Sequence, residues 1–439
     1  MFFGNKKNEE KQEENFVVSD YAMERYKKSQ HYNKVDLTNE EIEFLFCDKK
    51  DWNTALNSNF SKALEKGKVH YYDYSYIVFP EYTEIFEKST KFYNCIFYGN
   101  SLNGEEDFLF KECSFPIKES PFDIKANSNI YFYSNKADRP IEISHFMKLD
   151  MNNNELMSLS LSNDFINTKK IKKINMYNNK ISKKFYLSEG MGIDTLTIDD
   201  LEINEEADKF YIQSPLIINL HINRLKLNEI NCNFNELVIE NLEVNSSQFS
   251  TFFDLKKVQN NCNINYSKIK DFKGFNSSTL DLKIQNSELT FSSYDSIKSK
   301  SVNINDSKVN KLKIYDTKNV SLSKNNFRTL DLSDNIKNIY ITNSTVENKC
   351  SFTHLKNKNI CVLANNTFKK GVNFRFASIN KLAIYKSSFK ELDFDCSFIN
   401  EARFSQVKGL NEANEVEEIF DKHFASKESL RFFEKVTKI

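Results

Sequence analysis

The sequence has few glycines and prolines and no apolar run long enough to cross a membrane. Its 439 residues include only 9 Gly and 5 Pro, so Asn, Ser, Asp and Lys are expected to form its corners. No stretch approaches the roughly 18 apolar residues of a membrane-spanning helix. The first fifteen residues lack the apolar core of a secretory signal. The sequence therefore predicts a cytoplasmic protein, with a place at the periphery of the inner membrane as the alternative.

The sequence also lacks an excess of either charge. Lys and Arg total 61, as do Asp and Glu, so no nucleic-acid partner is expected. The cysteines form no CxxC pair, which favours reduced packing residues over disulfides or metal ligands. The eight cysteines are Cys47, Cys95, Cys113, Cys232, Cys262, Cys350, Cys361 and Cys396.

Catalytic motifs are missing as well. No two histidines have the spacing of metal ligands, and the sequence holds no GxGxxG, P-loop or GxSxG motif. The histidine His221 is expected to point outward from a strand. An acidic cluster could bind a cation, but its members flank the apolar Ile198, Leu201 and Ile203, which favours solvated outward positions. The cluster consists of Asp199, Asp200, Glu202, Glu205, Glu206 and Asp208. We assign no catalytic, cofactor-binding or metal-binding residue and expect no enzyme and no cofactor.

What the sequence does have is a repeat of five residues. It is clearest in Val372–Gln406, which reads VNFRF ASINK LAIYK SSFKE LDFDC SFINE ARFSQ. A helix repeats at 3.6 residues and a plain strand at 2, so neither explains this period. The third residues are large and apolar: Phe374, Ile379, Ile384, Phe389, Phe394, Ile399 and Phe404. The first residues are small or aliphatic: Val372, Ala377, Leu382, Ser387, Leu392, Ser397 and Ala402.

A period of five predicts a parallel coil. The first and third residues of each five point to one side of a short extended segment, and the other residues turn the chain. Four segments bring the chain back about one strand spacing, roughly 4.8 Å, above its start. The result is a right-handed, four-sided coil with two inward side chains on each face. Outward positions such as Asp393 are polar, and Phe398 is an exception.

The units SSF, LDF and ARF resemble the pentapeptide-repeat family. This resemblance implies an all-β solenoid, a right-handed parallel quadrilateral β-helix. It implies no single activity, because that family has no shared catalytic residue. Some of its members act as DNA mimics that bind type II topoisomerases, which requires an acidic surface. The runs Leu282–Asp316 and Val372–Gln406 are not acidic.

The repeat divides the chain into five expected parts. A second run of seven units covers Leu282–Asp316, and short α-helical segments are expected at both ends. Thr38 and Glu41 predict the start of one helix, and Asp51 predicts the start of another that ends at Gly67. The parts are a mobile charged tail (1–36), an N-terminal helical cap (37–69), irregular coils (70–194), regular coils (195–410) and a C-terminal helical cap (411–439).

Alternatives remain for the fold and for the function. The stretch Phe327–Ser344 also looks like a leucine-rich repeat, with Leu330, Leu332 and Asn335 in suggestive places. For function, we expect a scaffold whose solenoid faces bind a protein partner. The alternatives are a topoisomerase-binding DNA mimic and a soluble remnant of a membrane-linked protein that associates with membranes through its C-terminal helices. The sequence predicts neither the partner nor the oligomeric state.

Overall fold

The computed structural model describes most of the chain between residues 16 and 408. The described ranges are 16–67, 73–162, 170–188, 191–203, 209–212, 216–227, 232–233, 238–249, 258–272, 276–291 and 296–408. The chain divides into two compact units, residues 1–141 and 142–439. The expected C-terminal helical cap, 411–439, lies outside the described residues.

The first unit begins with three α-helices, of which two were expected. Helix α2 (Asn39–Phe46) has the predicted capping box of Thr38 and Glu41. Helix α3 (Asn57–Lys66) ends at Gly67 as predicted. Its start was misplaced at Asp51, because Asn53 caps a short 3-10 helix, η1 (Thr54–Leu56), that precedes it.

Helix α1 (Asp20–Lys28) lies in the stretch that was expected to be a mobile tail. Ser19 caps this helix by accepting a hydrogen bond from the Ala22 N–H, and the helix buries Ala22 and Tyr26. Only a narrow side of this helix is buried, so few of its residues are apolar. The sequence therefore shows no helical pattern of apolar residues here. The expectation of a mobile tail therefore does not hold for this stretch.

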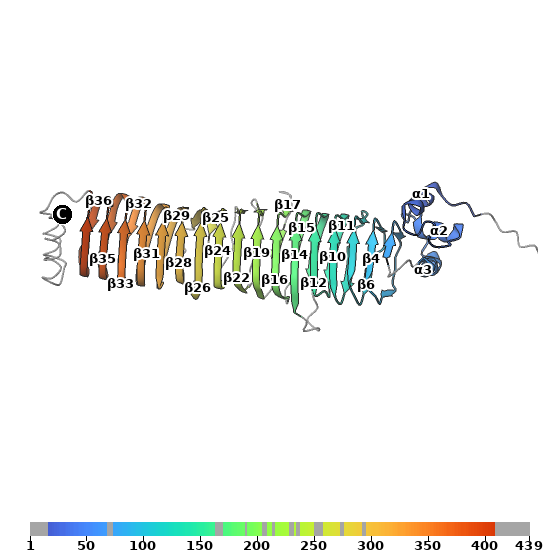
Figure 1. Ribbon diagram of the computed structural model, residues 1–439, viewed down its shortest axis with the longest axis horizontal. Coiled ribbons are helices and arrows are strands. Elements are labelled where there is room, and N and C mark those ends of the chain that lie inside the picture. Colours follow the sequence, from blue (N-terminus) through green and yellow to red (C-terminus); the bar gives the residue numbers. More distant parts are fainter. Residues whose placement is uncertain are drawn as a thin grey trace, which may run out of the picture. The chain divides into compact units, whose positions relative to one another are not determined.

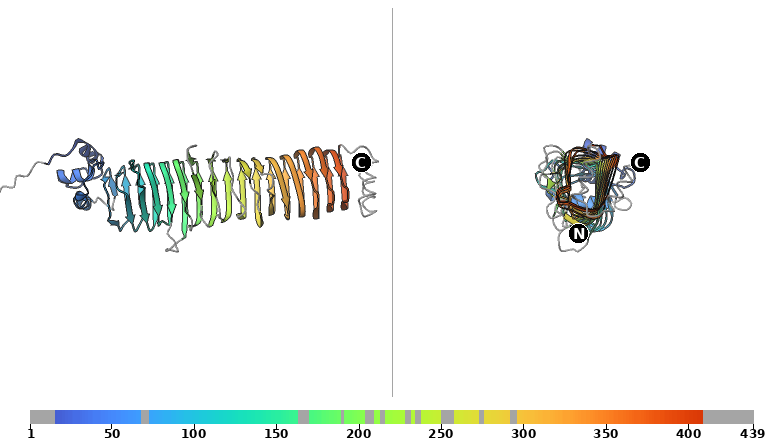
Figure 2. Two further views of the ribbon diagram at one scale, coloured as in Figure 1. Left: turned by 180° about the vertical axis from the view of Figure 1, so that it is seen from behind. Right: turned by 90° about the vertical axis from the view of Figure 1, so that its left-hand side faces the viewer.

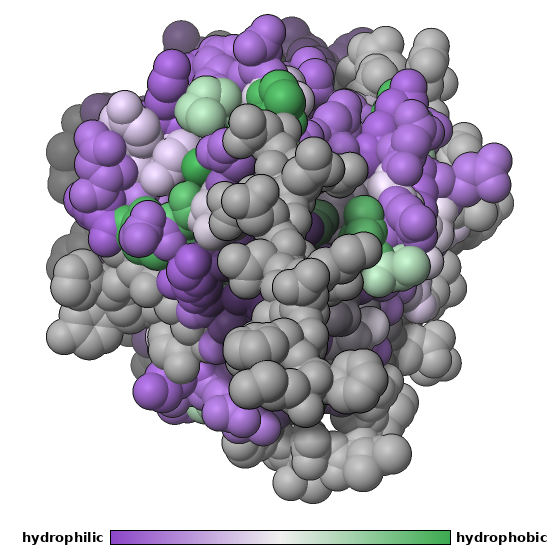
Figure 3. Space-filling model, turned by 90° about the vertical axis from the view of Figure 1, so that its right-hand side faces the viewer, coloured by the Kyte–Doolittle hydropathy of each residue, from purple (hydrophilic) through white to green (hydrophobic). Residues whose placement is uncertain are grey.

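The helices of the first unit cover its first coils. The Arg25 guanidinium donates to the carbonyl oxygens of Tyr76 and Asn94, both at 2.8 Å, and Phe60 meets Phe79 with ring centroids 5.6 Å apart. These contacts satisfy corner carbonyls that a bare solenoid end would expose. Seen from the direction of Figure 3, hydrophilic side chains prevail over the described surface and hydrophobic areas are small and separate.

The strands of the first unit are short and parallel. They form three ladders, β1-β4-β7-β10, β2-β5-β8-β11 and β3-β6-β9. Stacked aromatic rings fill the coil, as in Phe79–Phe97–Phe115 with centroids 4.9 and 5.1 Å apart. The strands are β1 (Asp73–Ser75), β2 (Val78–Phe79), β3 (Ile85–Phe86), β4 (Thr90–Tyr93), β5 (Ile96–Phe97), β6 (Ser101–Gly104), β7 (Phe108–Lys111), β8 (Ser114–Phe115), β9 (Phe122–Ala126), β10 (Asn129–Tyr133) and β11 (Lys136–Ser144).

The second unit is a stack of parallel coils, as predicted. Its strands lie side by side in chain order in Figure 1. Seen along the stack in Figure 2, the orange and red coils superimpose on a roughly four-cornered outline. The strands are β12 (Lys148–Asn152), β13 (Glu155–Ser162), β14 (Ile171–Tyr177), β15 (Lys180–Leu187), β16 (Gly192–Asp199), β17 (Glu202–Ile203), β18 (Lys209–Ile212), β19 (Leu216–Asn223), β20 (Lys226–Leu227), β21 (Cys232–Asn233), β22 (Val238–Asn245), β23 (Gln248–Phe249), β24 (Val258–Asn265), β25 (Lys268–Phe272), β26 (Asn276–Gln285), β27 (Glu288–Phe291), β28 (Lys298–Asn305), β29 (Lys308–Tyr315), β30 (Asn319–Ser323), β31 (Asn326–Thr342), β32 (Thr345–Ser351), β33 (Leu355–Ala364), β34 (Thr367–Asn373), β35 (Ser378–Tyr385), β36 (Ser388–Asp393) and β37 (Phe398–Ser405).

The register of five is confirmed by burial. Every third residue predicted between Val372 and Gln406 is buried, and so is every first residue except Leu392, which is half-buried. Phe398, the one apolar residue predicted to point outward in this run, is 50% exposed. In the run from Leu282 to Asp316, two of the predicted inward residues, Ser292 and Tyr294, lie outside the described residues. The others are buried.

One corner of the second unit repeats once per coil in the left-handed backbone region. Its N–H groups donate to the next coil, as Ser246 does to the Asn265 carbonyl at 2.9 Å. Asn, Asp, Ser and Lys occupy most of these corners, as predicted, because short polar side chains tolerate this conformation. The corner residues are Asn153, Asn178, Asp200, Arg224, Ser246, Tyr266, Asn286, Asp306, Lys324, Asn343, Asn365, Lys386 and Gln406.

The leucine-rich alternative does not describe residues 327–344. Leu330 and Leu332 are buried inside the coil, but Asn335 is exposed and donates to Asp316 Oδ1 at 2.9 Å. Strand β31 bends between two sheets, pairing with β29 and β32 in one and with β30 and β33 in the other. This stretch is therefore part of a closed coil.

Candidate binding faces of the second unit

The inside of the second unit holds a column of buried polar residues just after the left-handed corner. Each side chain accepts a hydrogen bond from the backbone N–H of the previous coil, as Ser287 Oγ does from the Ser267 N–H at 3.2 Å. The members from Ser247 onward are Ser247, Ser267, Ser287, Ser307, Asn325, Ser344, Asn366 and Ser387. The oxygen atoms of these side chains already accept backbone hydrogen bonds inside the coil. A binding partner would therefore contact the outward side chains.

Two sheet surfaces of the second unit face outward. We define face 1 as the outward side of the sheet that contains β24, β26, β28, β30, the second half of β31, β33, β35 and β37. Face 2 is the outward side of the sheet that contains β25, β27, β29, the first half of β31, β32, β34 and β36. Both sheets are parallel and in register from coil to coil.

Asparagine ladders cover face 1 in the middle coils. Asn261 Nδ2 donates to Asn241 Oδ1 at 2.8 Å, and Asn241 donates in turn to Asn219 at 3.0 Å. A second ladder joins Asn265 to Asn245 at 2.9 Å. The amides satisfy one another along the stack, so this part of face 1 is polar but already paired.

A groove of about 540 Å³ crosses the corner between the two faces. Glu288 lies in it between Lys268 at 3.1 Å and Lys308 at 3.7 Å, and the hydrogen bond from Lys268 lowers the Glu288 pKa. The Tyr266 side chain is 68% exposed. The groove is lined by Ser246, Ser247, Gln248, Tyr266, Ser267, Lys268, Asn286, Ser287, Glu288, Asp306 and Lys308. This lining of hydroxyls, amides and paired charges can bind a polar segment but includes no histidine or cysteine for nucleophilic chemistry.

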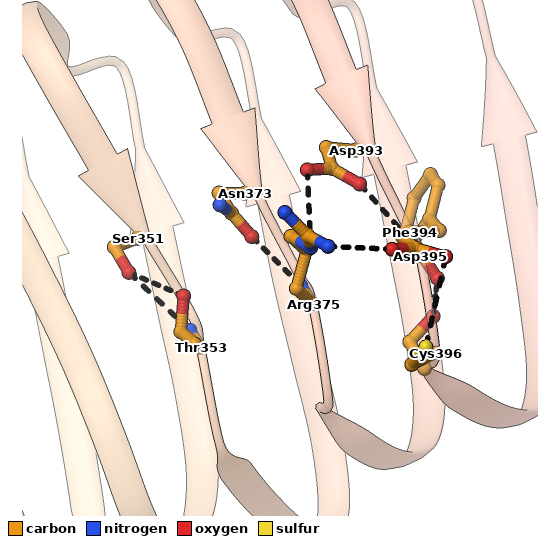
Figure 4. Close-up of polar contacts among 9 residues, drawn as sticks. Ser351, Thr353, Asn373, Arg375, Asp393, Phe394, Asp395 and Cys396 are labelled. Carbon is orange, nitrogen blue, oxygen red and sulfur yellow. Dashed lines mark hydrogen bonds and ion pairs between the residues drawn. The ribbon is translucent and has the colours of Figure 1, made fainter.

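A polar turn closes the last described coils (Figure 4). Arg375 Nη2 lies 2.7 Å from Asp395 Oδ2, and its Nε lies 3.8 Å from Asp393 Oδ2. Asp393 Oδ1 accepts a hydrogen bond from the Asp395 N–H at 3.0 Å, and Asn373 does the same for the Arg375 N–H at 2.8 Å. Each turn is therefore stabilised by a side chain two residues earlier, which is a structural arrangement.

The structure pairs the described members of the acidic cluster with bases. Asp199 lies 2.7 Å from Arg224, which also reaches Asp200 at 3.6 Å, and Glu202 lies 3.4 Å from Lys180. Three members, Glu205, Glu206 and Asp208, lie outside the described residues. In the part of the chain that the structure describes, no group of three or more metal-ligating side chains comes together.

The described histidines and cysteines form no cluster of three or more ligating side chains. His221 points outward as predicted, with Nδ1 3.0 Å from Glu243 Oε2. Cys262 and Cys350 are buried in the predicted inward positions, and burial raises the pKa of both thiols. The cysteines found free are Cys47, Cys95, Cys113, Cys262, Cys350, Cys361 and Cys396. The buried Cys262 and Cys350 thiols are therefore protonated at neutral pH.

Among the described residues, no helix is both long enough and apolar enough to span a membrane. The chain matches no protein family model, no characterised protein and no solved structure.

Proposed function

We propose that this protein is a non-enzymatic scaffold that binds a protein partner through the outward faces of its second unit. The observation that carries this proposal is the set of exposed aromatic side chains at outward positions of the coils. Tyr266 is 68% exposed, Phe376 51% and Phe398 50%. Aromatic residues are enriched at the centres of protein interfaces, and packing of the solenoid leaves these three in solvent.

The charge of the last coils supports a scaffold over a DNA mimic. A DNA mimic needs a continuous acidic surface in place of phosphates. Residues 296–408 contain 20 Lys and Arg but only 9 Asp and Glu.

Photo-cross-linking in cells of the natural source tests this proposal. A photoreactive amino acid replaces Tyr266 in the groove, Val362 on face 1 or Lys370 on face 2, each in the full chain. Lys27, an exposed residue of α1, is the matched control in the first unit. We expect at least one position of the second unit to give a discrete adduct of defined mass and Lys27 to give none. No adduct from any of the three positions, or equal labelling from Lys27, contradicts the scaffold.

A further inference from the structure

One column on face 1 changes its chemistry towards the C-terminal end. Its residues are paired in register through every coil. The first nine are polar: Asp150, Asn175, Thr197, His221, Glu243, Asn263, Lys283, Asn303 and Ser321. The next three are Tyr340, Val362 and Ala383, and the charged Arg403 follows in the last described coil. The column is therefore apolar over three successive coils, from Tyr340 to Ala383.

The neighbouring column of face 1 changes one coil later. Asn245, Asn265, Gln285, Asn305, Ser323 and Thr342 are followed by Ala364 and Tyr385, and then by Ser405. Tyr340 is 43% exposed and Tyr385 40%, while Val362, Ala364 and Ala383 are half-buried. We call these five residues the apolar strip. In the earlier coils, polar side chains cover these positions. In the apolar strip, apolar side chains are exposed to water instead, although the packing of the coil does not require them there.

Lysines flank the apolar strip. On one side, Lys337 lies three residues before Tyr340 and Lys358 four residues before Val362. Lys318 lies beside Lys337 in the preceding coil, where the Lys337 N–H donates to the Lys318 carbonyl at 3.1 Å. All three are exposed, and none forms an ion pair within residues 296–408. On the other side, Lys386 lies over the Tyr385 ring, 5.0 Å from its centroid. The strip thus has an apolar centre and a positively charged edge.

We propose that the apolar strip with its lysine edge is the docking surface for an acidic protein segment that carries apolar side chains between its carboxylates. The proposal rests on the scaffold function above and names the surface and the partner's chemistry. An apolar centre with a charged rim is the usual composition of a protein interface. The unpaired lysines supply charge complementarity to the partner's carboxylates.

Nucleic acid and lipid fit this surface less well. A phosphate backbone is bound by basic side chains along its path, whereas the middle of the strip holds Tyr340, Val362 and Ala383 and no charge. A lipid surface requires apolar side chains long enough to enter it, and Ala364 and Ala383 end at Cβ. In an acidic protein segment, carboxylates can pair with the lysines at the edge while apolar side chains contact the centre of the strip.

Fluorescence anisotropy with the full chain and a labelled peptide tests the surface. The probe is an extended 14-residue peptide that alternates Glu and Leu, compared with a single-stranded oligonucleotide and with vesicles that contain anionic lipid. We expect the peptide to bind most tightly. Lys318→Glu with Lys337→Glu should weaken peptide binding at least tenfold, and Tyr340→Ala about fivefold. Binding should also weaken as salt increases, because exposed charges are screened.

The matched control is Lys370→Glu with Lys390→Glu, which makes the same charge change on face 2. Both residues are exposed, and we expect peptide affinity within twofold of the unaltered chain. Equal loss in the two double variants, or tighter binding of the oligonucleotide or the vesicles, overturns the proposal. A cross-link that forms only from face 2 or the groove would overturn it too, while the scaffold function would stand. Unchanged melting temperatures show that the variants fold.

Discussion

The backbone N–H of Ser307 donates a hydrogen bond of 2.9 Å to Oδ1 of Asn325, one coil further along the stack. Both residues are buried. The Asn325 Nδ2 donates in turn to the Ile304 carbonyl at 2.7 Å. One amide therefore binds a buried backbone donor and a buried backbone acceptor just after the left-handed corner of the coil.

Replacement of Asn325 by Leu should destabilise the second unit strongly. The Leu side chain leaves the Ser307 N–H buried without its acceptor and removes the bond to the Ile304 carbonyl, and a buried unsatisfied group costs about 1–3 kcal/mol. We expect the free energy of unfolding to fall by about 1–3 kcal/mol, measured by urea denaturation. Asn326→Leu, at the next and exposed position, should change it by no more than about 0.5 kcal/mol.

A rescue variant separates the hydrogen bond from the shape of the side chain. Asn325→Ser keeps an oxygen that can accept from the Ser307 N–H, as Ser287 does in its own coil, but cannot reach the Ile304 carbonyl. Its loss of stability should lie between those of the unaltered chain and Asn325→Leu. A Ser variant as unstable as the Leu variant would contradict the role of this acceptor.

The sequence marked these corner residues only as small. Ser and Asn appeared in the first position of a five-residue unit because little space is available there, and that much could be predicted from Ser387 or Ser397. Their pairing across coils depends on which residues one turn brings together. Successive corners are 18 to 25 residues apart. Because this interval varies, the sequence alone does not predict which residues of neighbouring coils lie next to each other.

Phe394 and Asp393 should respond very differently to substitution. Phe394 is 3% exposed and stacks on Phe374 with ring centroids 4.8 Å apart, so Phe394→Ala should cost about 3–5 kcal/mol. Asp393 is half-buried and accepts one backbone hydrogen bond, so Asp393→Ala should cost about 1 kcal/mol. Thermal unfolding measures both, and equal losses would show that the inward and outward positions have been interchanged.

The helices of the first unit should lose stability in mild acid because of His31. This side chain is fully buried, neither ring nitrogen has a hydrogen-bond partner among the described residues, and burial lowers its pKa from 6.5 to about 4. The unfolded chain therefore binds a proton at higher pH than the folded unit does. Stability is fully present above pH 6.5 and declines by up to about 3 kcal/mol as the pH falls towards 4.

Trp52 provides the readout for the His31 prediction. It is the only tryptophan in the chain, and its ring contacts Phe44 and Phe60 with centroids 6.3 and 6.5 Å apart. Urea midpoints followed by its fluorescence should decrease between pH 6.5 and 4. The same experiment on His31→Met should give a smaller slope, because only carboxylates such as Glu41 then titrate. Identical slopes would exclude His31 as the cause.

Arg139 should be essential to the coils of the first unit. It is fully buried, and its guanidinium donates to the carbonyls of Gly99 at 2.7 Å and Pro121 at 2.9 Å. Arg139→Met leaves these acceptors without a donor and should cost at least about 2 kcal/mol. Lys136→Met, at an exposed position nearby, should have little effect. Urea denaturation of the two variants measures the difference. Equal unfolding midpoints for Arg139→Met and Lys136→Met would contradict this role.

The regular coils of the second unit could be predicted from sequence because their alternation is strict, whereas the short coils of the first unit could not. In Val372–Gln406 each coil repeats the same pair of inward positions. In the first unit, strands such as Val78–Phe79 have two residues, and Phe lies inward in several ladders without a fixed interval. The apolar strip was missed because its residues, Tyr340 and Val362 among them, are ordinary outward positions until the coils are aligned.

Distances between spin labels along one column of face 1 test the stacking of coils most directly. One label replaces Ser321, and the second replaces Val362, Ala383 or Arg403, which lie two, three and four coils away in register. Cys396→Ser and Cys47→Ser remove the two cysteines that are not buried among those whose side chains the structure describes. A parallel coil predicts that the mean distance grows by about 4.8 Å from each pair to the next. Distances that fail to increase in this order would contradict the solenoid register on which the binding faces depend.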